Sequence, residues 1–300
     1  MDKLKRLSVF VRVVELGSFT ACATEMNLGQ PAVSKAIDAL EVELGARLLI
    51  RKTRSLALTD EGRQAFAEAQ KVIDAYAGFA DSTATQAVPA GKIRVTCSTG
   101  LGSIYVLPKL KQFQKAFPRI QVQLIITDQF LDLADHQIDV AFRLGEIERG
   151  NFVIKRVGEI DRIAVAHENY FANGKPPTRL TDLNKENCIT VGSYNAPVPW
   201  LSLGANGDVV ATEVSGGIAV DNYLALVSAV NAALGIGLGV RFLFENNGKL
   251  KKGHRQILKK IRFKPFPLHI AFRESRALPA RIRAFIDFFY DDLKKQVWIR

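Results

Sequence analysis

The sequence predicts an α/β protein preceded by a small all-α domain. Three observations support this prediction. Apolar residues recur at helical spacing through residues 4–44, a long amphipathic stretch begins at residue 59, and short apolar runs alternate with helical patterns from residue 91 onward. Of the 300 residues, 48% are hydrophobic and 24% are charged. This length suits about two domains, and the composition excludes intrinsic disorder as the main state.

The N-terminal segment predicts three short helices. Apolar residues at positions 4–14 indicate a first helix that ends at Gly17, and Ser18 is a favourable N-cap for a second helix. Pro31 suits the first turn of a third helix, which ends at Gly45. Apolar residues of the third helix are spaced four, three and four apart and should face a core: Val33, Ile37, Leu40 and Leu44.

The start of the third helix carries polar side chains that should point outward. Gln30, Ser34 and Lys35 lie there, and the acidic residues come later on the helix. Gln pairs with adenine, Lys reaches guanine, and Ser bonds to either base in the major groove. A helix, a short turn and a second helix with a polar start form the helix-turn-helix pattern of double-stranded DNA binding. The alternative is a small three-helix domain with solvated polar faces.

Two short apolar stretches, residues 48–51 and 55–58, predict a hairpin after these helices. Its tip is the basic segment Lys52-Thr53-Arg54. Such a hairpin would form a wing in which Lys52 or Arg54 contacts phosphate or a narrow minor groove.

The net charge of +11 fits a polyanionic partner, but most of it lies elsewhere. Basic and acidic residues nearly balance over residues 1–62, whereas residues 241–264 contain many Lys and Arg and only one acidic residue, Glu245. DNA binding is therefore predicted from local geometry and not from net charge. The basic run 249–264 could be a second DNA contact, a funnel for an acidic effector, a solvated hairpin or an intersubunit face.

Residues 10–62 closely resemble the signature of the LysR-type transcriptional regulators. The matching segments are Phe10-Val11, Glu15-Leu16-Gly17-Ser18-Phe19-Thr20, Gln30-Pro31-Ala32-Val33-Ser34-Lys35, Leu40-Glu41, Leu44-Gly45, Arg47-Leu48 and Leu58-Thr59-Asp60-Glu61-Gly62. The resemblance implies a winged helix-turn-helix domain over residues 1–58. The DNA-binding residues it implies are Thr20, Gln30, Pro31, Ser34, Lys35, Lys52 and Arg54. Gly29 stands where Ser or Thr is common, but Gly is a tolerated cap, and Cys22 replaces the usual Ala.

A long helix should follow from Thr59 to about residue 87, before Pro89. Its apolar residues form a heptad-like seam: Phe66, Ala69, Ile73, Tyr76 and Ala80. The resemblance favours a dimerisation helix and hinge over residues 59–90. The alternative is packing of this helix against its own domain.

Residues 91–300 predict parallel sheets covered by helices on both faces. The strand candidates are Ile93–Cys97, Val122–Ile126, Ile138–Phe142, Ile163–Ala166, Ile189–Val191, Val209–Val214, Ile236–Val240 and Leu268–Phe272. This half also resembles the LysR-type effector domain, which is similar in fold to periplasmic binding proteins. The segments that carry this resemblance are Gly91-Lys92-Ile93-Arg94-Val95, Leu107-Pro108, Phe117-Pro118, Ile138-Asp139-Val140-Ala141-Phe142-Arg143 and Ala233-Leu234-Gly235-Ile236-Gly237, with Gln137 replacing a common glycine. The similarity implies an effector-binding domain of two α/β subdomains, residues 91–161 with 267–300 and residues 162–266, and a ligand cleft between them.

Ligands of open α/β sheets bind beyond the carboxyl ends of strands and near helix N-termini. The effector-binding candidates at such places are Ser98, Thr99, Gly100, Gln129, Phe130, Ser193, Asp221 and Asn222. Hydroxyls and free N–H groups at a helix start suit an anionic effector. The alternative is that these are ordinary turn and cap residues.

Enzymatic and metal-binding roles find little support. The four histidines lack ligand spacing, and no nucleophile elbow or Walker loop occurs. The three cysteines lie far apart, as expected for buried thiols in a reducing cytoplasm. The uncharged stretch 223–240 contains Gly235, Gly237 and Gly239, and indicates a helix and a buried strand instead of a membrane span. We therefore expect no cofactor apart from the effector, no membrane association and, since no signal peptide is evident, a cytoplasmic protein.

The sequence thus predicts a regulator that binds an interrupted inverted repeat as a homodimer or tetramer. RNA polymerase is a further partner that the resemblance implies. A solute-binding module would explain residues 91–300 but not residues 1–58. A non-specific architectural DNA binder is the other alternative, and the ratio of specific to non-specific affinity distinguishes it.

Overall fold

The computed structural model describes residues 1–52, 55–83, 88–133, 136–147, 152–172, 174–193, 196–197, 199–246, 248–274 and 278–300. The chain forms two compact units, one of Met1–Val88 with Ser275–Ala280 and the other of Pro89–Glu274 with Arg281–Arg300.

The first unit consists of helices and one hairpin. Its elements are α1 (Lys3–Leu16), α2 (Phe19–Glu25), α3 (Gln30–Leu44), β1 (Leu49–Lys52), β2 (Ser55–Leu58) and α4 (Asp60–Thr83). Gly17 and Gly45 end α1 and α3 in left-handed backbone, with φ of 62° and 65°. Ser18 caps α2 because its Oγ accepts a hydrogen bond from Ala21 N at 3.2 Å. These caps confirm the predicted helix ends.

The core of the first unit joins α1, α3 and the start of α4. The rings of Phe10 and Phe66 meet edge to face with centroids 6.1 Å apart. Val33, Ile37 and Leu40 of α3 are buried as predicted, but Leu44 is 51% exposed. The prediction for Leu44 was wrong because it is the last residue of α3, where the chain turns away at Gly45.

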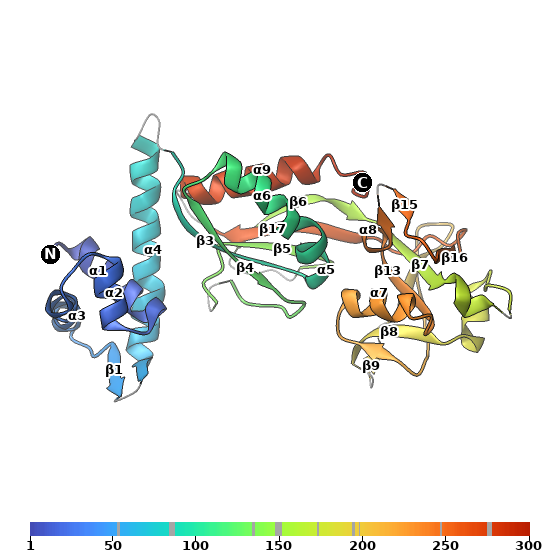
Figure 1. Ribbon diagram of the computed structural model, residues 1–300, viewed down its shortest axis with the longest axis horizontal. Helices are drawn as coiled ribbons and strands as arrows, with labels where there is room; N and C mark the ends of the chain where they lie inside the picture. Colours follow the sequence, from blue (N-terminus) through green and yellow to red (C-terminus); the bar gives the residue numbers. More distant parts are fainter. Residues whose placement is uncertain are drawn as a thin grey trace. The chain divides into compact units, whose positions relative to one another are not determined.

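α4 is one long helix (Figure 1). Its predicted apolar seam divides into two parts. Phe66 and Ala69 are buried in the core of the first unit, so this half packs against its own domain. Tyr76, in the second half of the seam, is exposed, as is Phe79, which was not among the predicted seam residues. The side chain of Ala80 lies outside what the structure describes. The helix therefore has an apolar surface that its own unit does not cover.

The second unit contains two sheets. Strand order in the first is β4-β3-β5-β17-β6, formed by β3 (Gly91–Cys97), β4 (Ile120–Ile126), β5 (Val140–Leu144), β6 (Phe152–Ile160) and β17 (Phe266–Arg273). Helices α6 (Leu107–Ala116) and α9 (Ala280–Leu293) lie together on one face of this sheet (Figure 1). The ring centroids of Phe113 in α6 and Phe285 in α9 are 5.0 Å apart. Those of Phe142 in β5 and Phe289 in α9 are 5.4 Å apart.

The second sheet has the strand order β12-β8-β13-β7-β16. Its strands are β7 (Arg162–His167), β8 (Cys188–Ser193), β12 (Ala219–Val220), β13 (Ile236–Val240) and β16 (His254–Ile257), and β9 (Ala196–Pro197) pairs with β8. Near it lie α7 (Tyr223–Asn231), α8 (Arg241–Phe244) and two hairpins, β10 (Trp200–Leu203) with β11 (Val209–Thr212) and β14 (Glu245–Asn246) with β15 (Lys249–Leu250). Short helical turns complete the unit: α5 (Thr99–Leu101), a π-helix (Gly102–Val106) and 3-10 helices Glu168–Phe171 and Leu180–Lys185.

Both sheets are mixed, which corrects the prediction of parallel sheets. β3 pairs in parallel with β4 and β5, but β17 is antiparallel to β5 and β6, and β7 is antiparallel to β13 and β16. The reason is the chain path between the sheets. β6 leads across Asp161 directly into β7 of the second sheet, and β17 carries the chain back into the first sheet. β6 and β17 therefore run in opposite directions.

Some strands differ from the expected ones. The stretch expected as a strand at 138–142 forms β5 two residues later, and the stretch at 209–214 forms β11 of a hairpin outside the main sheets. β6, β10 and β16 were not predicted. The uncharged stretch 223–240 forms α7 and the buried strand β13 as expected. Among the described helices, none is long and apolar enough to cross a membrane.

Candidate nucleic-acid interface and ligand cavity

The N-terminal turn of α3 presents a polar surface. Gln30, Pro31 and Lys35 are exposed and Ser34 is half-buried, whereas Val33 is fully buried. Gly29 is the N-cap and supplies no side-chain hydrogen bond to the helix. The first turn contains no acidic residue, so no carboxylate of that turn offsets the positive end of the helix dipole there.

The other predicted DNA contacts lie in different elements of the first unit. Thr20 is exposed on α2, and its carbonyl accepts a hydrogen bond from Thr24 Oγ1 at 3.1 Å. Lys52 is the last residue of β1. Arg54 lies outside the described residues, so its position at the wing tip stays a prediction.

Glu41 connects α3 to the hairpin, a contact that sequence reasoning missed. Its Oε1 accepts hydrogen bonds from Leu48 N at 2.7 Å and Leu49 N at 3.2 Å. Its side chain is only 10% exposed. One carboxylate that accepts hydrogen bonds from the first residue of β1 and from the residue before it sets the position of the wing relative to the recognition helix.

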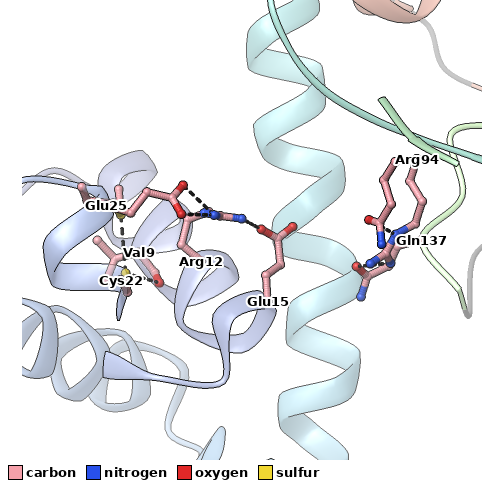
Figure 2. A network of polar contacts seen from close by, with 9 residues as sticks. Val9, Arg12, Glu15, Cys22, Glu25, Arg94 and Gln137 are labelled. Carbon is pink, nitrogen blue, oxygen red and sulfur yellow. Dashed lines mark hydrogen bonds and ion pairs between the residues drawn. The ribbon is translucent and has the colours of Figure 1, made fainter. Parts of the chain in front are cut away.

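A polar network joins α1 to α2 (Figure 2). The guanidinium of Arg12 lies between the carboxylates of Glu15 and Glu25 and forms ion pairs with both. The buried thiol of Cys22 is directed toward Val9 O at 3.8 Å and Met26 Sδ at 3.6 Å. Burial raises the pKa of this thiol, so Cys22 acts as a small packing residue between the two helices. Figure 2 also shows Arg94 beside Gln137 in the second unit, where Arg94 Nη1 donates to Gln137 Oε1 at 3.3 Å.

A cavity of about 310 Å³ lies between the two sheets of the second unit. Of the predicted effector residues, Ser98, Gly100, Phe130 and Asp221 line it. Its other lining residues come from both sheets and include Asp128, Phe142, Arg143, Glu146, Tyr223, Phe242, Leu243 and Phe266.

The remaining predicted effector residues serve local structure or lie outside the lining. Thr99 donates to Asp128 through its N and its Oγ1, at 2.9 and 2.5 Å. Asn222 caps α7 because its Oδ1 accepts from Ala225 N at 2.8 Å. Gln129 is exposed, and its carbonyl accepts from Arg143. The structure describes the backbone of Ser193 at the end of β8 and not its side chain.

Arg143 is a lining residue that was not predicted. It is 9% exposed and donates to the carbonyls of Gln129 at 3.3 Å and Leu131 at 3.2 Å. Its guanidinium carbon also lies 4.9 Å from the ring centroid of Phe130. Burial lowers the pKa of Arg143, although an arginine remains charged at neutral pH.

Arg162 lies beside the cavity at the start of β7 and was also not predicted. It is 8% exposed, and its guanidinium carbon lies 4.5 Å from the ring centroid of Phe266. Phe266 in turn meets Tyr223 edge to face, with centroids 6.1 Å apart. Burial lowers the pKa of Arg162 and raises that of Tyr223. The cation of Arg162, the ring of Phe266 and the phenol of Tyr223 therefore adjoin one another beside the cavity.

The two cysteines of the second unit, Cys97 and Cys188, are buried. Burial raises the pKa values of Cys97 and Cys188 to about 12, so both are thiols at neutral pH. Among the residues that the structure describes, no group of His, Cys, Asp and Glu is arranged to hold a metal ion.

Comparisons with known proteins agree with this architecture. Residues 4–63 match the family described as bacterial regulatory helix-turn-helix protein, lysR family, and residues 86–294 match the LysR substrate binding domain. The HTH-type transcriptional regulator PtxR of Pseudomonas aeruginosa is 28% identical over 98% of this chain and 94% of its own length. An HTH-type transcriptional repressor of another Pseudomonas aeruginosa strain is 30% identical over 96% of this chain and 91% of its own.

A solved structure supports the same conclusion about the fold. CrgA, a LysR-type transcriptional regulator from Neisseria meningitidis, aligns with a TM-score of 0.62 and 26% identity. The alignment covers 96% of this chain and 98% of that one.

Proposed function

The chain belongs to the LysR-type family of transcriptional regulators, and from this membership we propose that it binds specific operators under the control of a small-molecule effector. The observation that carries the proposal is the exposed polar start of α3 on a helix whose other side is buried in the core. A helix of this kind enters the major groove by its N-terminus.

In this proposal the side chains at the start of α3 read base edges. Gln30 pairs with adenine, Lys35 with guanine, and Ser34 with either base. Pro31 contributes apolar contact, and Thr20 contacts the backbone from α2. The wing, with Lys52 and Arg54, holds phosphates or the adjacent minor groove. Glu41 keeps wing and helix in register through its bonds to Leu48 and Leu49.

The effector binds in the cavity between the two sheets and changes the angle between them. Two chain connections, at Asp161 and just before Phe266, link the sheets and can act as hinges. A ligand that touches both sheets favours one angle over another, and by linkage the bound DNA favours the same state. In an oligomer, this change alters the spacing of the DNA-binding domains along the operator.

The regulator works as a homodimer or a dimer of dimers on an interrupted inverted repeat. The exposed apolar side chains of α4, among them Tyr76 and Phe79, support self-association through this helix. Contact with RNA polymerase would convert operator binding into a change in transcription. We assign the chain no enzymatic step and place its action in the cytoplasm, where the DNA is.

Selection of sheared genomic DNA by the full-length protein at two salt concentrations tests the proposal. We expect recovery of a few intergenic sites that contain interrupted inverted repeats and persist at the higher salt. The Gln30→Ala variant is the matched control and should recover these sites with lower enrichment. Broad recovery that vanishes with salt would contradict the proposal, because phosphate contacts alone are lost as salt rises.

A further inference from the structure

Two buried arginines lie at the cavity between the sheets: Arg143 lines it, and Arg162 lies beside it against the lining residue Phe266. Arg143 and Arg162 are 9% and 8% exposed. In the described part of the chain, neither forms an ion pair with a carboxylate, and Nε of Arg162 is buried without a hydrogen-bond partner. A buried cation without a counter-charge is costly, so an anion bound here would recover that cost as binding energy.

The acidic residues of the cavity wall are already engaged with other groups. Asp128 accepts two hydrogen bonds from Thr99, and Glu146 pairs with Lys264 at 3.3 Å. Asp221 accepts from Asn222 Nδ2 at 2.8 Å. Each of these carboxylates therefore accepts from at least one donor, of which Lys264 is charged and Thr99 and Asn222 are neutral.

Two hydroxyl donors of the cavity have no acceptor within the described part of the chain. The Oγ of Ser98 is buried without a hydrogen-bond partner. The hydroxyl of Tyr223 also forms no hydrogen bond within the part of the chain that the structure describes. Together with Arg143, these groups favour a ligand that accepts hydrogen bonds and carries negative charge.

The rest of the cavity lining is largely apolar and favours a ligand with an apolar body. Phe130, Phe142, Phe242 and Phe266 line the cavity together with Leu243. The volume of about 310 Å³ lies at the small end of ligand pockets. Rings at the wall favour a flat ligand because aromatic faces and edges pack closely.

We propose that the ligand of this cavity is an organic anion with a single carboxylate on a flat apolar body about one ring in size. The carboxylate accepts from Arg143, Tyr223 and Ser98, and the ring lies among the phenylalanines. Arg162 is a positioning residue that acts through Phe266 and Tyr223. This assignment rests on the proposed function of the cavity as the effector site.

Isothermal titration calorimetry on the full-length protein tests the ligand class with benzoate, benzamide and acetate as probes. We expect saturable binding of benzoate. Benzamide has the same shape without the charge, and acetate has the charge without the ring, so each should bind at least about ten-fold more weakly. Absence of benzoate binding, or equal affinity for benzoate and either other probe, would overturn the proposal.

Variants of the cavity wall locate the binding site. Arg143→Gln should abolish benzoate binding, and Tyr223→Phe, which keeps the ring beside Phe266, should weaken it about five- to ten-fold. Arg156→Gln is the matched control, because Arg156 is exposed and pairs with Glu159 away from the cavity. Because Arg143→Gln also removes two bonds to carbonyls, its folding should be checked by circular dichroism. Wild-type affinity in the Tyr223→Phe variant would overturn the proposed site even if Arg143→Gln fails to fold.

DNA selection by the same protein preparations separates this proposal from the proposed function. A protein that selects specific sites but binds no benzoate refutes the ligand class and leaves the regulator intact. A protein that binds benzoate through Arg143 and Tyr223 but selects no DNA supports the ligand class and refutes the regulator.

Discussion

Replacement of Glu41 tests whether its carboxylate holds the wing against the recognition helix. Its Oε1 accepts from the backbone N–H groups of Leu48 and Leu49, at 2.7 and 3.2 Å, and the side chain is 10% exposed. A hydrogen bond to a charged group contributes ~1.5–3 kcal/mol. Because water can reach part of the freed backbone, Glu41→Ala should lower the unfolding free energy of the first unit by about 2–4 kcal/mol. Glu41→Gln should cost only about 1–2 kcal/mol, since both bonds go to one oxygen and an amide oxygen can replace it.

Hydrogen exchange of the full-length protein, followed by mass spectrometry, reports this local opening directly. In Glu41→Ala, the amides of Leu48 and Leu49 should exchange at least about ten-fold faster than in the wild type, with Glu41→Gln between the two. Glu68→Ala is the control, because Glu68 is 62% exposed and pairs with Lys71 on the same helix, and surface pairs contribute little. Exchange of these amides at the wild-type rate in Glu41→Ala would refute the reasoning.

Other predictions concern base readout, packing, pH and thiol reactivity. Gln30→Ala should weaken binding to the selected operator by ~1–3 kcal/mol and leave unrelated duplexes unaffected in fluorescence anisotropy; equal loss on all duplexes would exclude base readout. Gly62→Ala places a Cβ 2.0 Å from the carbonyl oxygen of Leu48, so thermal unfolding of the first unit should occur at a lower temperature, and an unchanged midpoint would contradict this packing. Burial, with the nearby charges of Lys251 and His167, lowers the pKa of His254 below 6.5. As pH falls, the unfolded chain takes up the His254 proton before the folded chain does, so the stability present above pH 6.5 is lost below it. His254→Gln should therefore flatten the dependence of the urea-unfolding free energy on pH between about pH 7 and about pH 5. The same pH dependence in the variant and the wild type would count against this role of His254. Because burial raises the pKa values of Cys97 and Cys188 to about 12, neither should react with iodoacetamide in the native protein at about pH 8, and mass spectrometry that finds rapid labelling would disprove their burial.

The first unit could be predicted closely from the sequence because its signals are local. Helical periodicity, Gly at the helix ends and Ser18 as a cap act within a few residues of one another. The bonds from Glu41 to Leu48 and Leu49 were not predictable in the same way. They depend on how the chain after Gly45 folds back along α3, which no short-range pattern specifies.

The second unit was less predictable because its strands pair over long distances. β6 contains Lys155, Arg156 and Glu159, and this polar content hid an edge strand that pairs with β17 more than a hundred residues later. The chain crosses between sheets at Asp161, with no turn signal of glycine or proline. The antiparallel pairing of β17 follows from that crossing, and helix–strand alternation alone could not indicate it.

Only part of the ligand cavity was predictable from the sequence, because its residues also come together over long distances in the chain. Ser98, Gly100, Phe130 and Asp221 follow strands or precede helices, and the rule for open sheets placed them at the cavity. Arg143 lies within the otherwise apolar strand β5, and the rule for ligand positions in open sheets does not single it out. Its burial without an acidic partner becomes visible only when the fold brings the two sheets together.

The ratio of specific to non-specific affinity of the full-length protein tests the central claim most directly. It is measured as the dissociation constant for the selected operator against that for a scrambled duplex of equal length, at one near-physiological salt concentration. The account predicts a ratio of about 10³ or more. As salt increases, the scrambled duplex should lose a larger fraction of its binding free energy than the operator, because phosphate contacts supply most of its binding. A ratio near one, with both affinities falling together as salt increases, would contradict the claim that α3 reads sequence.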